Sequence, residues 1–327
     1  MTVSEIPGIY AGYVVNSTRY GGDSGITVGV AAESEGSAGL VYSNVDAIEK
    51  HGFGTMTRLI RTLFLNGAMK VYAQPVSDGD YAAAFVELKG KADIIICDSG
   101  DAEVIEDMKE ALEDMPYCVG IAEFDGSAEE CVETAQSMNF ERLVILGNVS
   151  ANEGELAAAF AGFTAYKNDP MTAFNGAHLF GCSLPANEFT TVETEALIAG
   201  GVTPVDCDGS LPVVVRAVTT KTLTDGVPDK SLRELNTVLS ANRVIKTVSE
   251  ALKVKFASGR NDALTRGAIR SQVLVELEKL MQAGVIESYG NVSAVADADD
   301  ATVCRVGFEY TAAHGLNTIM LTAYLEV

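Results

Sequence analysis

The residues best suited to chemistry follow an apolar run in "ADIIICDSGD", residues 92–101. Asp98, Ser99 and Asp101 come directly after this run, and ligand sites of α/β proteins lie outside the carboxyl ends of the strands. A metal or a nucleophile could therefore be placed there. Asp and Ser are also preferred at helix N-termini, so we favour the interpretation that Asp98 and Ser99 cap a helix expected at residues 101–114.

Other signatures of catalysis or cofactor binding are missing. The sequence contains no phosphate loop, no GxGxxG fingerprint and no GxSxG elbow. An acidic cluster near the C-terminus lacks the glycine and distal glutamate of an EF-hand loop, so we expect a hairpin turn there rather than a calcium site. The histidines stand alone, without a second ligand at helical spacing. We expect no catalytic residue, no metal and no cofactor. The residues considered are His51, His178, His314, Asp297, Asp299 and Asp300.

The cysteines show no metal or redox motif, because none of them forms a CxxC pair. Several lie in apolar runs, where cysteine behaves as a small buried hydrophobe. The six are Cys97, Cys118, Cys131, Cys182, Cys207 and Cys304.

The composition provides enough hydrophobic residues for a large core and gives the protein a strongly negative net charge. The 327 residues are 47% hydrophobic, yet no apolar run reaches the length of a membrane span. The N-terminus resembles no secretion signal, so we expect a protein made in the cytoplasm. Residues 1–195 hold 10 basic and 30 acidic residues, whereas residues 216–280 hold 12 basic and 7 acidic ones. This distribution argues against nucleic acid binding, while the basic segment suits an acidic partner.

Hydrophobic periodicity predicts an α/β architecture followed by a different C-terminal part. Apolar strands alternate with amphipathic helices up to about residue 183, which is typical of βαβ units and a mostly parallel sheet. A β-branched strand at 211–220, helices at 242–256 and 262–283 and an antiparallel meander are expected after it. Gly284 would end the second helix.

The sequence pattern predicts a strand at each end of the chain that could separate from the rest of the subunit. Ile9, Ala11, Tyr13 and Val15 alternate before the Gly21-Gly22 pair. The last eleven residues, "NTIMLTAYLEV", alternate to the end, with Ile319, Leu321, Ala323 and Leu325 on one face. An apolar end strand is a template for pairing with another chain.

Five segments in order resemble the contractile tail sheath family. They are "IPGIYAGY" near the start, "RTLFLNGAMKVYAQPV" at 61–76, "AAAFAGFTAYKNDPMTAFNGA" at 157–177, "ALIAGGVTPVDCDGSLPVVVRAVTTKT" at 196–222 and "LVELEKLMQAGVI" at 274–286. The resemblance implies a structural subunit of a phage tail or phage-tail-like particle. Its partners would be further copies of itself, an inner tube, and baseplate and tail terminator proteins. Membrane insertion is not expected.

The resemblance also implies a domain plan. Residues 1–22 would be a linking arm, 23–195 an α/β domain, 196–316 a C-terminal α+β domain and 317–327 a second linking strand. The end strands would add to sheets of neighbouring subunits by β-augmentation. Arg260, Arg266 and Arg270 would face an acidic inner tube or, alternatively, acidic groups of neighbouring sheath subunits. The competing hypothesis is a cytosolic α/β enzyme or binding protein with a site near Asp98.

Overall fold

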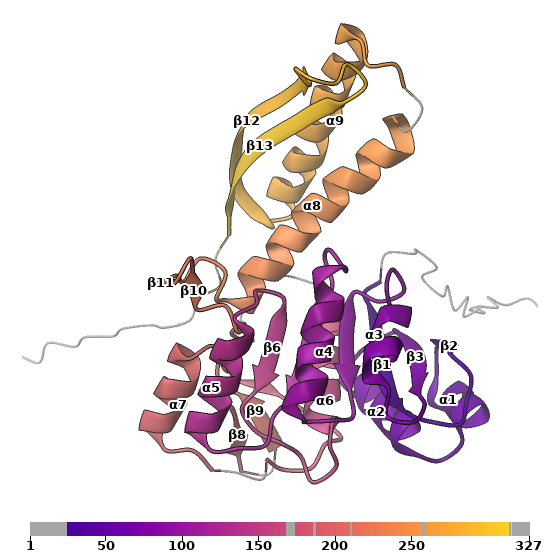
Figure 1. Ribbon diagram of the computed structural model, residues 1–327, viewed down its shortest axis with the longest axis vertical. Helices are drawn as coiled ribbons and strands as arrows, with labels where there is room; N and C mark the ends of the chain where they lie inside the picture. The colour runs from indigo at the N-terminus through magenta and orange to yellow at the C-terminus, as the bar shows by residue number, and fades with distance from the viewer. Residues whose placement is uncertain are drawn as a thin grey trace, which may run out of the picture.

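The computed structural model describes residues 25–167, 174–185, 188–209, 211–256, 259–313 and 315. They form two parts, which Figure 1 shows one above the other. The lower part, called the α/β body here, extends from residue 25 into helix α8 (Leu235–Phe256). The upper part, called the C-terminal domain, contains the rest of α8 and the elements that follow it.

The α/β body is built on a six-stranded sheet that is parallel except at one edge. β2 runs antiparallel to β3, and the other neighbours run parallel. The predicted mostly parallel sheet is therefore confirmed. In spatial order the strands are β2 (Gly39–Val41), β3 (Lys70–Val76), β1 (Thr27–Glu33), β4 (Ile94–Cys97), β5 (Val119–Glu123) and β6 (Leu143–Leu146).

Helices cover both faces of this sheet, as the continuously apolar strands require. One core packs α2 (Thr55–Leu65) and α6 (Glu155–Lys167) on one face. The other packs α3 (Tyr81–Glu87), α4 (Ala102–Glu113) and α5 (Ala128–Met138) on the opposite face. α1 (Asn44–His51) lies beside α2, and α7 (Thr191–Ala199) lies beside α5.

Helix α6 is apolar on nearly all sides because the six-stranded sheet, α2 beside it and the small sheet that follows it all pack against it. The close approach of the two helices depends on Gly162. A Cβ atom at this position would lie 2.6 Å from the backbone oxygen of Leu63. Any larger residue there would force α2 and α6 apart.

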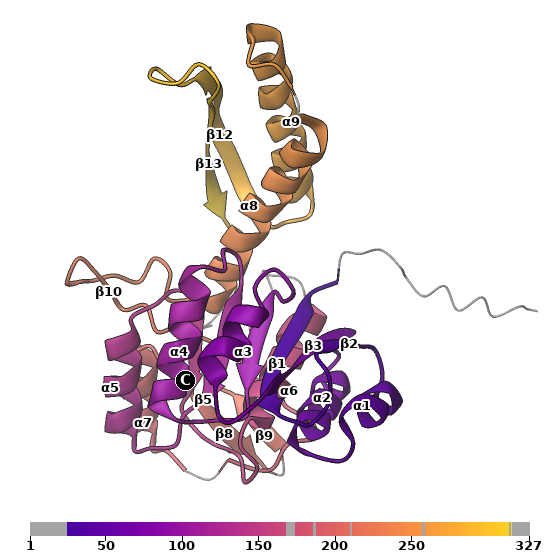
Figure 2. The same ribbon diagram turned by 45° about the vertical axis from the view of Figure 1, so that its right-hand side comes forward.

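A small antiparallel sheet follows α6, where the sequence pattern predicted longer strands. Its strands, in spatial order, are β7 (Ala177–His178), β9 (Leu211–Val214) and β8 (Val205–Asp208). The short hairpin of β10 (Leu223–Thr224) and β11 (Val227–Pro228) projects from the body (Figure 2). Asn139 holds its base, because its side-chain oxygen accepts hydrogen bonds from the backbone N–H groups of Thr222 and Leu223, each 3.0 Å long.

The C-terminal domain is an α+β unit of two helices and a hairpin. α8 packs against α9 (Ala263–Gln282), and the antiparallel pair β12 (Ile286–Ala296) and β13 (Cys304–Ala312) covers them. Asp262 caps α9 by accepting a hydrogen bond from the N–H of Thr265 at 2.8 Å. Gly284 follows the helix with φ +76°, as its predicted role after the last turn requires.

The packing places the division between the two parts later than the expected residue 196. Leu197, Val205 and Leu235 are all buried in the cores of the α/β body. The core of the C-terminal domain begins at Val244. The boundary therefore lies inside α8, because the first turns of this helix pack on the body and the later turns do not.

Of the six cysteines, Cys97, Cys118 and Cys131 are buried, as predicted. Cys207 is exposed, which the core interpretation did not anticipate. Within the described ranges, no helix is both long and apolar enough to cross a membrane.

Candidate functional site

The carboxyl edge of the parallel sheet is where an α/β enzyme would bind its ligand, and Asp98 lies there. Its Oδ2 accepts a hydrogen bond from the N–H of Glu33, at the end of β1, at 3.0 Å. Its Oδ1 accepts one from the Tyr81 hydroxyl of α3 at 2.7 Å. Burial, followed by this contact with Asp98, raises the pKa of Tyr81. Asp98 thus ties together β1 and α3.

The predicted helix-capping role of Asp98 is wrong. The N-cap of α4 is Asp101, and its side chain makes no capping hydrogen bond. Ser99 does serve the turn, since its hydroxyl accepts a hydrogen bond from the N–H of Asp101 at 3.2 Å. The ends of β1 and β4 meet at this edge, so the N–H of Glu33 lies within hydrogen-bonding distance of Asp98. The Asp98 side chain therefore bonds to β1 and not to the first turn of α4.

The loop before α6 covers the carboxyl end of β4. Gly154 of this loop has φ +83°, and a Cβ there would lie 2.7 Å from the backbone oxygen of Cys97. Only glycine permits both the left-handed backbone and the contact. The loop therefore closes directly over the sheet edge where a ligand would bind.

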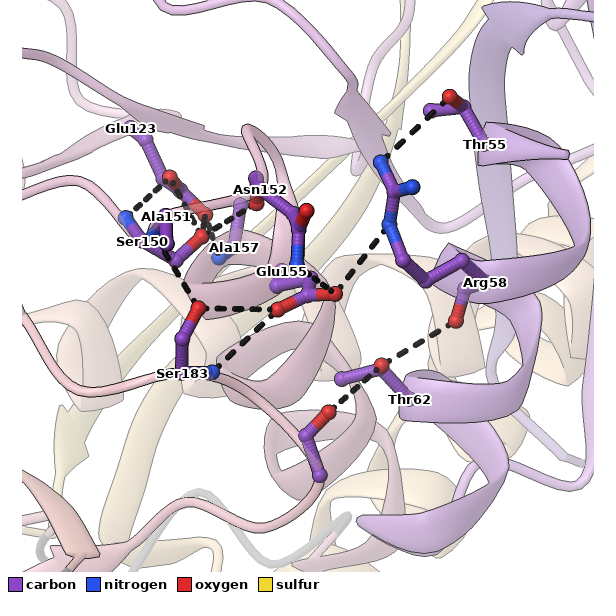
Figure 3. Close-up of polar contacts among 11 residues, drawn as sticks. Thr55, Arg58, Thr62, Glu123, Ser150, Ala151, Asn152, Glu155, Ala157 and Ser183 are labelled. Atoms are coloured by element: carbon purple, nitrogen blue, oxygen red, sulfur yellow. Dashed lines mark hydrogen bonds and ion pairs between the residues drawn. The ribbon is translucent and has the colours of Figure 1, made fainter.

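The N-terminus of α6 is occupied by a side chain of the protein itself. Glu123, at the end of β5, accepts hydrogen bonds from the N–H of Ala157 at 3.0 Å and from the N–H of Ser150 at 3.1 Å (Figure 3). The two bonds end on different carboxylate oxygens. Burial raises the pKa of Glu123 to about 7, although the backbone N–H donors act in the opposite direction. A helix N-terminus of this kind can bind an anionic ligand, and here its N–H groups are used by the protein's own carboxyl group.

A second buried carboxylate, Glu155, extends this network to α2. It accepts hydrogen bonds from the Ser183 N–H at 3.3 Å and the Ser183 hydroxyl at 3.2 Å. Its other oxygen lies 3.2 Å from Nε of Arg58 (Figure 3). Glu123 and Glu155 together pin α6, the segment around Ser183 and α2 to the sheet. The sequence analysis identified neither residue. Glu123 could have been noticed, because it is an acidic residue at the end of the otherwise apolar strand "VGIAE".

The remaining candidates for chemistry have structural partners or stand alone. The Asp297 carboxylate accepts hydrogen bonds from the N–H groups of Asp299 and Asp300 and pairs with Arg305, so the cluster forms the turn between β12 and β13. Nδ1 of His51 lies 3.0 Å from the Ser34 hydroxyl, and His178 is exposed on β7. In the described part of the chain, no group of three His, Cys, Asp or Glu residues could hold a metal ion. His314 lies outside the described residues.

A surface suited to assembly lies on the C-terminal domain. Among the strands that the structure describes, β12 and β13 pair only with each other, so each has one edge free for a further strand. One face of the hairpin packs on α8 and α9 through Ile286, Val292 and Phe308. The hairpin is thus firmly supported while its edges remain available.

The three arginines expected to face a partner differ in their surroundings. Arg266 donates hydrogen bonds to the backbone and side-chain oxygens of Asn261, both 3.0 Å long. Arg270 donates from Nε to the backbone oxygen of Val292 at 2.8 Å. Arg260 is exposed and forms no ion pair with the described residues. Its neighbour Asn261 donates to the backbone oxygens of Ala301 and Val303, so the α8–α9 turn lies beside the aspartate-rich hairpin turn.

The eight residues predicted to form inter-subunit strands all lie outside the described residues. They are Ile9, Ala11, Tyr13, Val15, Ile319, Leu321, Ala323 and Leu325.

Comparison with known proteins connects this fold to one kind of particle. Residues 227–326 match the family model of the phage tail sheath C-terminal domain. The chain shares the fold of a protein in the anti-feeding prophage baseplate, with a TM-score of 0.75, 15% identity and 99% and 100% of the two chains covered. The same prophage's helical sheath in its contracted state gives a TM-score of 0.71, 15% identity and the same coverage. No curated protein sequence matches the chain.

A crystal structure shows the same likeness in another organism. The sheath tail protein of Desulfitobacterium hafniense has a TM-score of 0.67 and 13% identity, with 93% of this chain and 100% of that one covered. The fold and the C-terminal match therefore both point to sheath tail proteins, one through the whole chain and the other through its last third. Residues 227–326 thus match the sheath C-terminal domain, and the chain as a whole has the fold of the sheath tail proteins.

Proposed function

We propose that copies of this chain polymerise into a helical sheath around an inner tube, and that contraction of the sheath drives the tube through a cell envelope. The observation that carries this proposal is the sheath C-terminal domain at 227–326, on a chain whose whole length has the fold of a contracted sheath protein. The work would come from a difference in packing between two arrays of the same folded subunit. The particle would be assembled in a bacterial cytoplasm.

The open edges of β12 and β13 support β-augmentation as the link between subunits. In this proposal, the strands at residues 1–22 and 317–327 add to hairpins of neighbouring copies. Residues 1–22, if extended at about 3.3 Å per residue, would span about 70 Å, enough to cross a neighbour. Head-to-tail contacts of this kind do not close on themselves, so they generate a helical array. Likeness to a baseplate protein supports docking of the array on a baseplate at one end, with a terminator at the other.

Contact with the inner tube is proposed at the α8–α9 end of the C-terminal domain. Arg260 and Lys253 are exposed there, and the apolar side chains Val254 and Leu264 are each 85% exposed. Lys255 and Arg270 are exposed as well, and their hydrogen bonds end on the neutral oxygens of Gln272 and Val292, so they keep their positive charge. Exposed charge pairs are individually weak, about 0–1 kcal/mol, which suits a tube that must slide free. Arg266 and Arg270 remain part of the proposed contact, because hydrogen bonds to neutral oxygens hold their side chains without cancelling their charge.

Electron microscopy of the purified chain tests the sheath proposal. Long tubes or stacked rings are expected, and uniform small particles would instead favour a soluble α/β binding protein or enzyme. The tube contact is tested by the double variant Arg260→Glu and Lys253→Glu. It should form contracted sheath alone but fail to form extended sheath on tubes. Failure to form either kind of sheath would assign these cations to contacts between sheath subunits.

A further inference from the structure

The C-terminal domain joins the α/β body through a single helix. In α8, Leu235 and Val238 belong to a core of the body, and Val244 and Val248 belong to the core of the C-terminal domain. Figure 1 shows the helix leaving one end of the body and carrying α9 and the hairpin with it. The angle at which α8 leaves therefore sets where the assembly edges of β12 and β13 lie.

One carboxylate connects this helix to the first strand of the body. Asp93, directly before β4, accepts a hydrogen bond through Oδ2 from the N–H of Thr27, at the start of β1, at 3.0 Å. Its Oδ1 lies 2.6 Å from Nζ of Lys246, in the first turns of α8 beyond the body core. The same side chain thus holds β1 and α8 at once.

A second contact lies nearby on the same helix. The side-chain amide of Asn242 donates to the backbone oxygen of Tyr117 at 3.3 Å. Tyr117 has φ +74°, a conformation that non-glycine residues rarely adopt. The loop before β5 therefore also meets α8, one turn below Lys246.

Lys246 is charged under all ordinary conditions. Burial lowers its pKa, but the hydrogen bond and charge of Asp93 outweigh burial and leave the pKa raised. Glu250, one turn further along α8, adds to this effect. The side chains of Lys246 and Asp93 are 43% and 29% exposed, so salt can still weaken the pair.

We infer that Asp93 is a positioning residue that favours one direction of the C-terminal domain relative to the start of β1. This inference rests on the proposed function in one respect: the proposed linking arm, residues 1–22, joins the body just before β1. By holding both elements, Asp93 would set the arm's point of attachment and the receiving hairpin in one geometry. A half-exposed ion pair biases such an equilibrium by about fivefold at most, which keeps the joint adjustable.

Distance measurement by pulsed electron paramagnetic resonance tests the joint. Spin labels are placed at Glu110→Cys on α4 and Val275→Cys on α9, both exposed positions. The cysteines that are not buried, Cys182, Cys207 and Cys304, are replaced by serine. The full-length chain is diluted with unlabelled protein, so that only distances within one molecule are read. Circular dichroism melting confirms that each variant is folded.

Lys246→Gln removes the ion pair and leaves the Thr27 contact intact. We expect a broader distance distribution or a second distance. The population of molecules in the alternative arrangement should rise by up to about fivefold. Wild type in 1 M salt should show a similar change, because salt screens the ion pair. Lys246→Arg should restore the narrow distribution. Lys253→Gln, further along α8, is the matched control and should resemble wild type.

An unchanged distribution in Lys246→Gln would overturn the inference, and so would equal broadening in Lys253→Gln. Both results are independent of sheath formation. If the wild type forms no tubes in the microscope, the proposed function fails while the distance measurement still decides the role of Asp93.

Discussion

The carboxylate of Glu123 accepts a hydrogen bond from the backbone N–H of Ala157, 3.0 Å away, in the first turn of α6. In an α/β enzyme the corresponding helix terminus is free to bind an anionic ligand. Here the ligand position belongs to the protein's own side chain, and the loop at Gly154 closes the neighbouring strand end. In the described residues, the protein's own groups therefore fill the positions at this sheet edge where an α/β enzyme would hold its ligand.

Glu123→Gln should destabilise the protein by about 1–3 kcal/mol at acidic pH, because its amide NH2 would face one of the two backbone N–H donors, where the neutral carboxyl group still presents an oxygen. The folded pKa of about 7 lies above the ordinary value of 4.5. The wild-type side chain therefore contributes most stability below pH 4.5, and this contribution is lost as the pH rises through 7.

Chemical denaturation at pH 4.5 to 8.5 measures this effect. The stability advantage of wild type over Glu123→Gln should fall between pH 4.5 and 7 by at most about 1.4 kcal/mol per pH unit. Over this range the advantage should vanish or change sign, and the difference should then level off. Glu129→Gln, an exposed acid on α5, should show no such trend. A difference that is constant with pH would mean that Glu123 titrates at its ordinary pKa.

Tyr81→Phe should cost about 0.5–1.5 kcal/mol of stability, because it removes the hydroxyl that donates to Asp98. Asp98→Ala should cost more, because it also leaves the Glu33 N–H without its acceptor. Asp101→Ala is the control, since this N-cap side chain makes no capping bond. A larger loss from Asp101→Ala than from Asp98→Ala would reinstate the helix-capping interpretation.

Deleting residues 1–16 or 318–327 should leave a folded protein that forms no tubes. The reason is the alternating pattern at both ends of the chain, which suits strands added to a neighbour. Electron microscopy and size-exclusion chromatography read out assembly, and circular dichroism reads out folding. Unfolding of either truncated chain would show that its end strand belongs to its own core.

Arg266→Ala should lower the free energy of unfolding by about 1 kcal/mol, because it removes two hydrogen bonds that hold Asn261 in the α8–α9 turn. Arg260→Ala should leave stability within about 0.5 kcal/mol of wild type, as expected for an exposed side chain away from such features. Thermal unfolding compares the two variants directly. Equal losses would mean that Arg260 has a structural partner.

Local patterns along the chain were sufficient for much of the fold. The apolar runs of β4, β5 and β6 and Gly284 after α9 each act over a few residues, so the sequence predicts them directly. The predictions of secondary structure were least accurate for short elements. Only two residues of "GAHLFGCSL" form a strand, and β2 escaped notice at the sheet edge, because so few residues carry no periodic signal.

The sequence by itself determined the alternation of strands and helices, the charge division and the sheath-like motifs, because each is a property of neighbouring residues or of composition. Tertiary structure alone decided which distant groups meet. Lys246 and Asp93 are 153 positions apart, and Glu123 and Ala157 are 34 apart. The boundary inside α8 and the hydrogen bonds of Arg266 and Arg270 within the domain likewise depend on the tertiary structure. A side chain's partner depends on the path of the whole backbone through space, and no local pattern contains that path.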